Sequence, residues 1–212
     1  MSNDYRNTKY DPLFSDLKLK KADVEKLVKE RHPRSKDMHK YISINGGQFK
    51  KEFVKSYNGK CAYCGVSIDI IPMSLFQIDH FVYQESAEFS GSKAAAGSID
   101  NLVLACGNCN HNKRDFFVPS NEREHLHPDN EYICSTFVRD NNYYIKIADK
   151  QISNEVVKKY YEKLKLDLEI HRLDYLLMSM IGLQTKLTDK HPAYLMLGQA
   201  IDLLKNKRNV MA

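Results

Sequence analysis

The 212-residue sequence lacks an uninterrupted apolar run of about 18 residues, the length that a membrane-spanning helix needs. It also lacks the pattern of a secretory signal, since its first 16 residues are polar and in places acidic rather than basic and then apolar. These two absences predict a protein of the cytoplasm with no membrane partner.

Cysteine is scarce, and the five cysteines are an odd number, which argues against a disulfide framework. Four of them form two C-x-x-C pairs, and Cys134 is left over in the strand-like segment EYICSTFV, where we expect a buried free thiol. The chain also lacks a large excess of charge of one sign. A net charge of +5 and an isoelectric point near 8.8 permit a nucleic-acid partner without requiring one.

What the chain does have is one strong metal-binding pattern: the pairs Cys61/Cys64 in KCAYCG and Cys106/Cys109 in ACGNCN. Two residues between thiolates allow a tight turn to direct both sulfurs at one ion, and two such turns supply the four ligands of tetrahedral zinc. A site closed by four cysteines is structural, because no water can reach the metal. The 41 residues between the pairs, from Gly65 to Ala105, must contain further structure.

Apolar periodicity and turn residues predict the elements around these pairs. Residues 1–16 read as an irregular arm. Helices are predicted over residues 17–32, ended by Pro33, and over 47–57, ended by Asn58-Gly59. Residues 75–83 and 99–105 read as two short strands separated by a long loop over 84–98, and a helix follows the second strand.

In the C-terminal part, residues 131–147 read as a hairpin that turns at RDNN. A helical region follows from Ser153 to about Gly182, with a break near Leu166-Asp167. A last helix is predicted with Thr188 or Asp189 as its cap and Pro192 in its first turn.

Three motifs then appear in order: I-D-H (Ile78–His80), N-L-V-L-A-C (Asn101–Cys106) and C-x-x-C-N-x-x-K (Cys106–Lys113). Together with the cysteine pairs they resemble the HNH endonuclease family over roughly residues 47–118. The resemblance implies an α+β fold with a small ββα-metal core, stapled by zinc and extended by the hairpin and by helices at both ends. The expected divisions are 1–46, an N-terminal arm and helix; 47–130, the nuclease core; and 131–212, the hairpin and helical extension.

The resemblance assigns catalytic roles to residues of these motifs. His80 is the expected general base, since a neutral imidazole can take a proton from water; a half-buried strand histidine is the plain alternative. Asp79 and Asn110 are expected to hold one Mg²⁺ or Mn²⁺ ion. Asn110 could instead cap a helix, with His111 as the alternative ligand. In a regular strand Asp79 and His80 point to opposite faces, so the resemblance implies a local distortion there.

The remaining polar positions have a functional and an ordinary interpretation. Asn101 is expected to tie the loop together and steady His80, although a turn asparagine would look the same. Lys113 and Arg114 follow Asn110 by one helical turn and could contact the same phosphate, or could be solvated. His125 and His127 are read as surface residues. His32, His39, His171 and His191 are read as surface or satisfied core residues, and the paired tyrosines Tyr143, Tyr144, Tyr160 and Tyr161 as core rather than base-stacking.

The resemblance implies a metal-dependent endonuclease, with DNA the favoured substrate, that leaves a 5′ phosphate. One site cuts one strand, so double-strand breaks require a homodimer or two events. The C-terminal extension, with its YY-x-K-L element, is more loosely similar to the nuclease subunit of Septu-type anti-phage systems, which acts with an ATPase partner. The alternatives are a stand-alone restriction-type enzyme, an RNA-cleaving nuclease and a catalytically inactive zinc-stapled binding protein.

Overall fold

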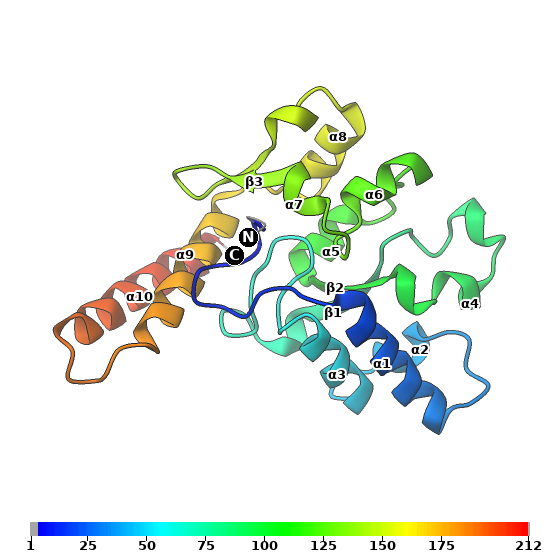
Figure 1. Cartoon of the computed structure of the whole chain (residues 1–212), viewed down its shortest axis with the longest axis horizontal. Helices are drawn as coiled ribbons and strands as arrows, with labels where there is room; N and C mark the ends of the chain where they lie inside the picture. Colours follow the sequence, from blue (N-terminus) through cyan, green and yellow to red (C-terminus); the bar gives the residue numbers. More distant parts are fainter. Residues whose placement is uncertain (1–3, 212) are drawn as a thin grey trace.

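The computed structural model describes residues 4–211 and shows an α+β protein (Figure 1). A small two-stranded sheet, β1–β2, lies at the centre. The N-terminal helices pack on one side of it, a second hairpin with α8 lies above it, and a pair of long helices projects to the other side. The predicted fold class is confirmed. No helix among residues 4–211 combines the length and the apolar character needed to cross a bilayer.

The N-terminal part consists of an irregular arm and three helices, which are α1 (Leu17–Arg31), α2 (His39–Ile42) and α3 (Gln48–Ser56). Helices α1 and α3 pack against each other and correspond to the two predicted helices. After α3, Asn58 and Gly59 adopt positive φ angles of 52° and 70°, which ends the helix as expected. Helix α2 was not predicted, and it lies next to the candidate active site.

The predicted strand–loop–strand–helix order is confirmed. Strand β1 (Phe76–His80), preceded by the 3-10 turn η1 (Met73–Leu75), pairs antiparallel with β2 (Leu102–Cys106), and α5 (Gly107–Lys113) packs on both strands. The predicted loop between the strands contains short helical turns, namely η2 (Ala87–Phe89), α4 (Lys93–Ala96) and η3 (Ile99–Asn101). The Ser92 hydroxyl accepts a hydrogen bond from the Ala95 N–H, which starts α4 as an N-cap.

The segment after α5 holds η4 (Ser120–Glu122), α6 (Arg123–Leu126), α7 (Ile133–Thr136), and the strands β3 (Phe137–Arg139) and β4 (Ile145–Ile147), followed by η5 (Asp149–Gln151). The second hairpin is confirmed, but its first arm is shorter than predicted. The Thr136 hydroxyl lies within hydrogen-bond distance of the Tyr132 and His125 carbonyls, which favours a helical turn over a strand. Cys134 therefore lies in α7 and is half-buried, not buried in a strand.

Three helices complete the chain: α8 (Glu155–Lys163), α9 (Glu169–Gln184) and α10 (Pro192–Met211). The predicted break near Leu166-Asp167 is confirmed. Two details differ. Helix α9 passes through Gly182, where a Cβ atom would lie 2.6 Å from the Tyr10 Cβ, so this glycine permits close packing and does not end the helix. The first turn of α10 is capped by His191, whose Nδ1 accepts from the Ala193 N–H, instead of by Thr188 or Asp189.

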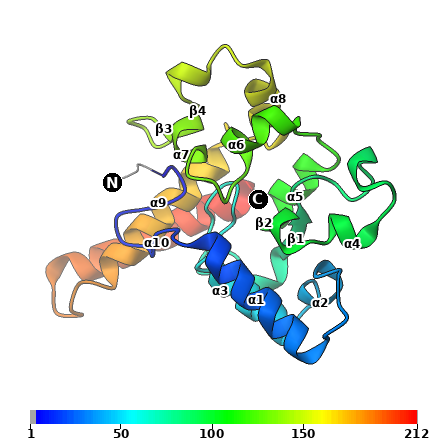
Figure 2. The same ribbon diagram turned by 45° about the vertical axis from the view of Figure 1, so that its right-hand side comes forward.

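One hydrophobic core joins most of these parts, running from Tyr5 in the arm to Leu166 after α8. Helix α8 contributes Val157 and Tyr160 to it, so this helix shares its core with the β1–β2 hairpin. Helices α9 and α10 pack along each other and are joined by the buried ion pair Asp174–Arg208. They form a hairpin on the opposite side of the molecule from α2 (Figure 2).

Candidate active site and metal centre

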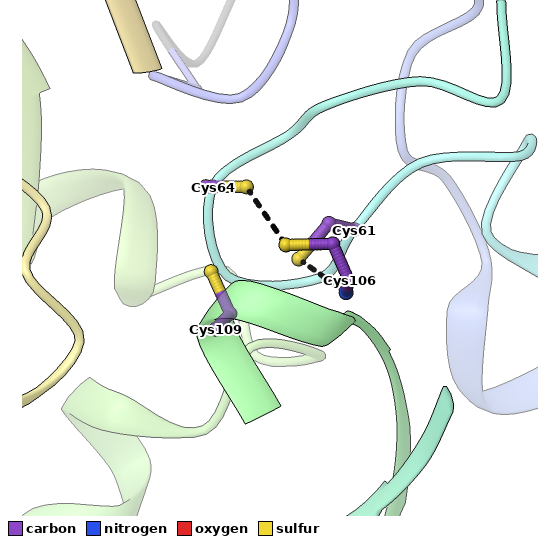
Figure 3. Close-up of side chains that lie close together, drawn as sticks. All are labelled: Cys61, Cys64, Cys106 and Cys109. Atoms are coloured by element: carbon purple, nitrogen blue, oxygen red, sulfur yellow. Dashed lines mark hydrogen bonds between the residues drawn. The ribbon is translucent and has the colours of Figure 1, made fainter. Parts of the chain in front are cut away.

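The four cysteines of the two C-x-x-C pairs meet at one buried point (Figure 3). All four Sγ atoms lie within 4.8 Å of one another, and the Sγ atoms of Cys64 and Cys106 are 3.8 Å apart. Tetrahedral zinc with Zn–S bonds of about 2.3 Å requires sulfurs about 3.8 Å apart. The sulfur arrangement therefore fits a zinc ion, and it leaves no open coordination position.

Each pair is held by its own local structure. Cys61 and Cys64 lie on a tight turn in which the Gly65 N–H donates to the Cys61 carbonyl, and Gly65 has a φ of 83° that other residues rarely adopt. Cys106 ends β2 and Cys109 lies in the first turn of α5. The Cys106 N–H donates to the Cys61 sulfur at 3.3 Å, so the second turn also orients a ligand of the first.

The thiol pKa values indicate that the cluster needs a cation before all of its thiols can ionise. Burial alone would raise the pKa of Cys61, but hydrogen bonds with the other three thiols lower it well below its usual value. The pKa values of Cys64 and Cys109 are raised well above normal, first by their hydrogen bonds with Cys106. Without a cation only part of the cluster can ionise, because thiolates this close repel one another. A divalent ion removes that conflict, so the donor set fits zinc in its chemistry as well as its geometry.

Asp79 lies near the end of β1 with its carboxylate buried. Tyr63, inside the first cysteine turn, donates its hydroxyl proton to Oδ2, and Lys113 of α5 forms an ion pair at 3.0 Å. Burial raises the pKa of Asp79, and Lys113 and Tyr63 oppose that rise. The same Lys113 ammonium donates to the His80 carbonyl oxygen at 2.8 Å. Lys113 is fully buried in these contacts, so it is not placed to contact a phosphate as we expected.

His80 is the last residue of β1 and is only partly buried. Its ring packs on the ring of His39 at the start of α2, with centroids 4.3 Å apart, and the His39 Nε2 lies 3.3 Å from the Ile78 carbonyl oxygen. Burial, and then His39, lowers the pKa of His80 to about 4. The imidazole is therefore neutral at pH 7, the form that can accept a proton.

The register of β1 on β2 is continuous from Phe76↔Cys106 to His80↔Leu102. The local distortion implied by the family resemblance is not seen in this pairing. Neighbouring side chains of a regular strand point to opposite faces. Accordingly, Asp79 pairs with Lys113 of α5, whereas the His80 ring packs on His39 of α2. The two side chains thus lie on opposite faces near one strand end.

Asn101 makes the contacts expected of a residue that closes the loop. Its Oδ1 accepts from the Val82 N–H at 2.9 Å, and its Nδ2 donates to the carbonyls of Val82 and Ala96 at 2.9 and 2.8 Å. Its own carbonyl accepts from the Phe81 N–H, directly after His80. These four hydrogen bonds fix the exit of β1 against the entrance of β2.

The Asn110 Nδ2 donates to Gln77 Oε1, and Gln77 lies two places before Asp79 on the same face of β1. Asn110 is therefore on the same side of the hairpin as Asp79, and it does not act as the N-cap of α5, a position held by Cys106. Arg114 is exposed and contacts His111 of its own helix. Within residues 4–211, the four cysteines are the only group of three or more His, Cys, Asp or Glu side chains close enough to share an ion.

Sequence reasoning missed two residues of this site. His39 was read as a surface or core histidine, yet it contacts His80; Tyr63 was not singled out, yet it bonds to Asp79. No local pattern marks either one, because both contacts join segments far apart in the sequence. A cavity of about 890 Å³ lies elsewhere, between the N-terminal arm and residues 124–134, and none of the predicted site residues lines it.

Most of the other histidines have ordinary packing roles, and among the four paired tyrosines the core interpretation is wrong for Tyr143, which is exposed. His127 packs on Phe81 and is hydrogen-bonded at both ring nitrogens, and His125 is half-buried, so the surface interpretation of these two is wrong. His171 is buried and bonded to the Lys165 carbonyl. Tyr160 is buried in the core and packs against Phe137, as the core interpretation predicts for this residue.

Comparison with known proteins found one similarity, and it covers this site. No curated protein and no solved structure matched the chain. A family model described as HNH endonuclease matches residues 61–116, which span both cysteine pairs, the β1–β2 hairpin and α5. The central segment of this chain, with its buried four-cysteine cluster that fits zinc, is thus similar to an HNH endonuclease domain.

Proposed function

We propose that the protein is a metal-dependent endonuclease that hydrolyses phosphodiester bonds, with DNA as the favoured substrate. The observation that carries this proposal is His80: a neutral, partly exposed imidazole at the strand end of a ββα unit that matches the HNH endonuclease model. Relatives of this type use such a histidine as general base. An inactive zinc-stapled binding protein would leave that placement without a role, whereas a restriction-type enzyme or an RNA-cleaving nuclease would use His80 in the same way.

In the proposed reaction His80 accepts a proton from the attacking water. A pKa of about 4 makes the imidazole a weak base in the free protein. A bound phosphodiester brings negative charge next to the ring, which raises the pKa of His80 toward neutrality, where general-base catalysis is most effective. Packing on His39 fixes the plane of the ring, and the Asn101 hydrogen bonds hold the backbone that follows it.

Asp79 and Asn110 are the residues proposed to hold a divalent ion, Mg²⁺ or Mn²⁺, because both lie on the α5 side of β1 and carry hard oxygen ligands. Tyr63 and Lys113 engage both Asp79 oxygens in this structure, so an ion there would compete with the Lys113 ammonium, and a bound phosphate would have to reach His80 around the strand end. The Asn110 amide nitrogen is used by Gln77, which leaves its oxygen to face a ligand. Such an ion supplies charge neutralisation at the phosphate and the leaving oxygen. Lys113 keeps the Asp79 carboxylate in place, and the exposed Arg114 remains available to a phosphate.

The experiment for this proposal incubates the purified, zinc-loaded chain with supercoiled plasmid and, separately, with single-stranded RNA, each with Mg²⁺, with Mn²⁺ or without added metal. We expect metal-dependent nicking of the plasmid that leaves a 5′ phosphate and a 3′ hydroxyl, as relatives do. Cleavage of RNA but not of the plasmid would show that the substrate is RNA and not DNA. Cleavage of neither by a folded, zinc-loaded chain in any metal would contradict the proposal.

We further propose that this nuclease acts in bacterial anti-phage defence, in the cytoplasm, with an ATPase subunit docked on the α9–α10 hairpin. Helix α10 supports a docking role because it exposes Leu195, Met196, Leu203 and Val210 on a projecting element. Since α8 shares the nuclease core, the informative deletion removes residues 186–212 and not the whole extension. We expect the deletion to abolish co-purification with the ATPase and to leave the zinc content unchanged. Retained co-purification would show that the α9–α10 hairpin is not the docking site.

A further inference from the structure

The connector between α1 and α2 carries a concentration of positive charge. Residues 31–40, RHPRSKDMHK, contain the basic residues Arg31, Arg34, Lys36 and Lys40 and only one acidic residue, Asp37. All four basic residues are exposed. We call the side chains of Arg34, Lys36 and Lys40 the connector surface.

These three cations lack the ion pairs that several lysines on the helices of this protein make. On α1, α3 and α8, Lys29, Lys55 and Lys158 each pair with a glutamate three or four residues away. Among residues 4–211, no ion pair involves a side chain of the connector surface. Asp37, the only nearby acid in the segment, accepts from the Lys40 backbone N–H and lies against Gly97. The connector surface is thus a patch of uncompensated positive charge.

The connector is fixed next to the candidate active site by four contacts. The Met38 N–H donates to the Gly97 carbonyl at 2.8 Å, and a Cβ atom on Gly97 would lie 2.1 Å from the Asp37 carboxylate, so the backbones meet closely. His39 packs on His80 and bonds to Ile78. Lys40 follows His39 directly in α2, and its ammonium lies 5.7 Å from the centroid of the Tyr41 ring. Both ribbon views place α2 beside the β1–β2 hairpin and α4.

The site needs such a surface, because one of the two predicted phosphate contacts is not available. Lys113 is fully buried with Asp79 and the His80 carbonyl, which leaves Arg114, directly after α5, as the exposed member of the predicted pair. Nucleic-acid binding requires several cations along the backbone, since each phosphate that is neutralised releases counterions and adds to the affinity.

We propose that the connector surface binds the phosphate backbone of the nucleic-acid substrate and leads it to His80. The proposal rests on the proposed nuclease function, but it adds a binding surface formed by residues 34–40, outside the segment that matches the family model. Because it recognises phosphates and not base edges, the surface is expected to contribute affinity without sequence preference.

The test measures binding apart from cleavage. A fluorescently labelled DNA duplex is titrated with the His80→Ala chain in the absence of added divalent metal, and its anisotropy is followed from 50 to 200 mM salt. The test variant adds Arg34→Gln, Lys36→Gln and Lys40→Gln. The matched control adds Lys186→Gln, Lys190→Gln and Lys205→Gln, three exposed lysines of the α9–α10 region without ion pairs among the described residues. Both triple variants lose three positive charges, so a difference in their DNA affinity cannot come from net charge alone.

We expect the connector variant to bind at least about tenfold more weakly and to lower the slope of log affinity against log salt by roughly 2 to 3, while the control stays close to the parent. Equal weakening by both variants, or none by the connector variant, would overturn the proposal. The outcome is independent of the nuclease assay. A chain that binds DNA through the connector surface but cuts no substrate would contradict the proposed nuclease function and still support the proposed binding surface.

Discussion

Replacing Cys61 with serine is expected to abolish tight zinc binding and to unfold the core around the β1–β2 hairpin. The Cys61 sulfur is one of the four in the cluster and accepts from the Cys106 N–H, and all four cysteines belong to the main hydrophobic core. Zinc in small structural sites contributes on the order of 10 kcal/mol to folding, and whole domains are stable by about 5–15 kcal/mol. Losing one of four ligands therefore removes an amount comparable to the total stability.

The measurement is zinc content by mass spectrometry of metals together with a thermal melt. Cys134→Ser is the matched control, because Cys134 is half-buried in α7 and takes no part in the cluster. We expect one zinc per chain in the wild type and the control, and little zinc with no cooperative melt for Cys61→Ser. A Cys61→Ser chain that melts like the wild type would show that the cluster does not staple the fold.

The elements of the nuclease core could be predicted from the sequence because their signals are local. Two C-x-x-C pairs fix turn geometry, Asn58-Gly59 ends a helix, and short alternating strands flank a polar loop. Even the break between α8 and α9 was visible in the periodicity. Local signals failed where a tertiary contact decides the structure, as at Gly182, which passes Tyr10 closely inside an unbroken helix.

The side-chain environment of the site could be predicted only in part. The resemblance of the motifs predicts His80, Asp79, Asn101 and Asn110 as site residues, but their spacing does not reveal which partner a buried charge finds. Lys113 was expected to face solvent phosphate and instead neutralises Asp79 inside the protein. A buried carboxylate needs such a partner, since an unpaired charge in the core is strongly unfavourable. His39 was missed for the same reason, because its contact with His80 joins α2 to β1.

Replacing His80 with alanine is expected to lower the cleavage rate by about 10² to 10⁴-fold, the usual contribution of a general base. The fold should persist, because the ring is partly exposed at a strand end and Lys113 bonds to the backbone carbonyl, which the substitution keeps. The loss should appear in kcat more than in KM, since the imidazole acts on the attacking water. His191→Ala is the matched control, because it removes an exposed imidazole at the start of α10, away from the site.

The most direct test of the nuclease assignment is therefore plasmid nicking by zinc-loaded wild-type, His80→Ala and His191→Ala chains in Mg²⁺ or Mn²⁺, with the melting temperature of each chain measured in parallel. The account predicts nicking by the wild type and by His191→Ala, and the stated loss for a folded His80→Ala chain. Equal nicking by all three chains would show that His80 is not the base and would contradict the proposed mechanism.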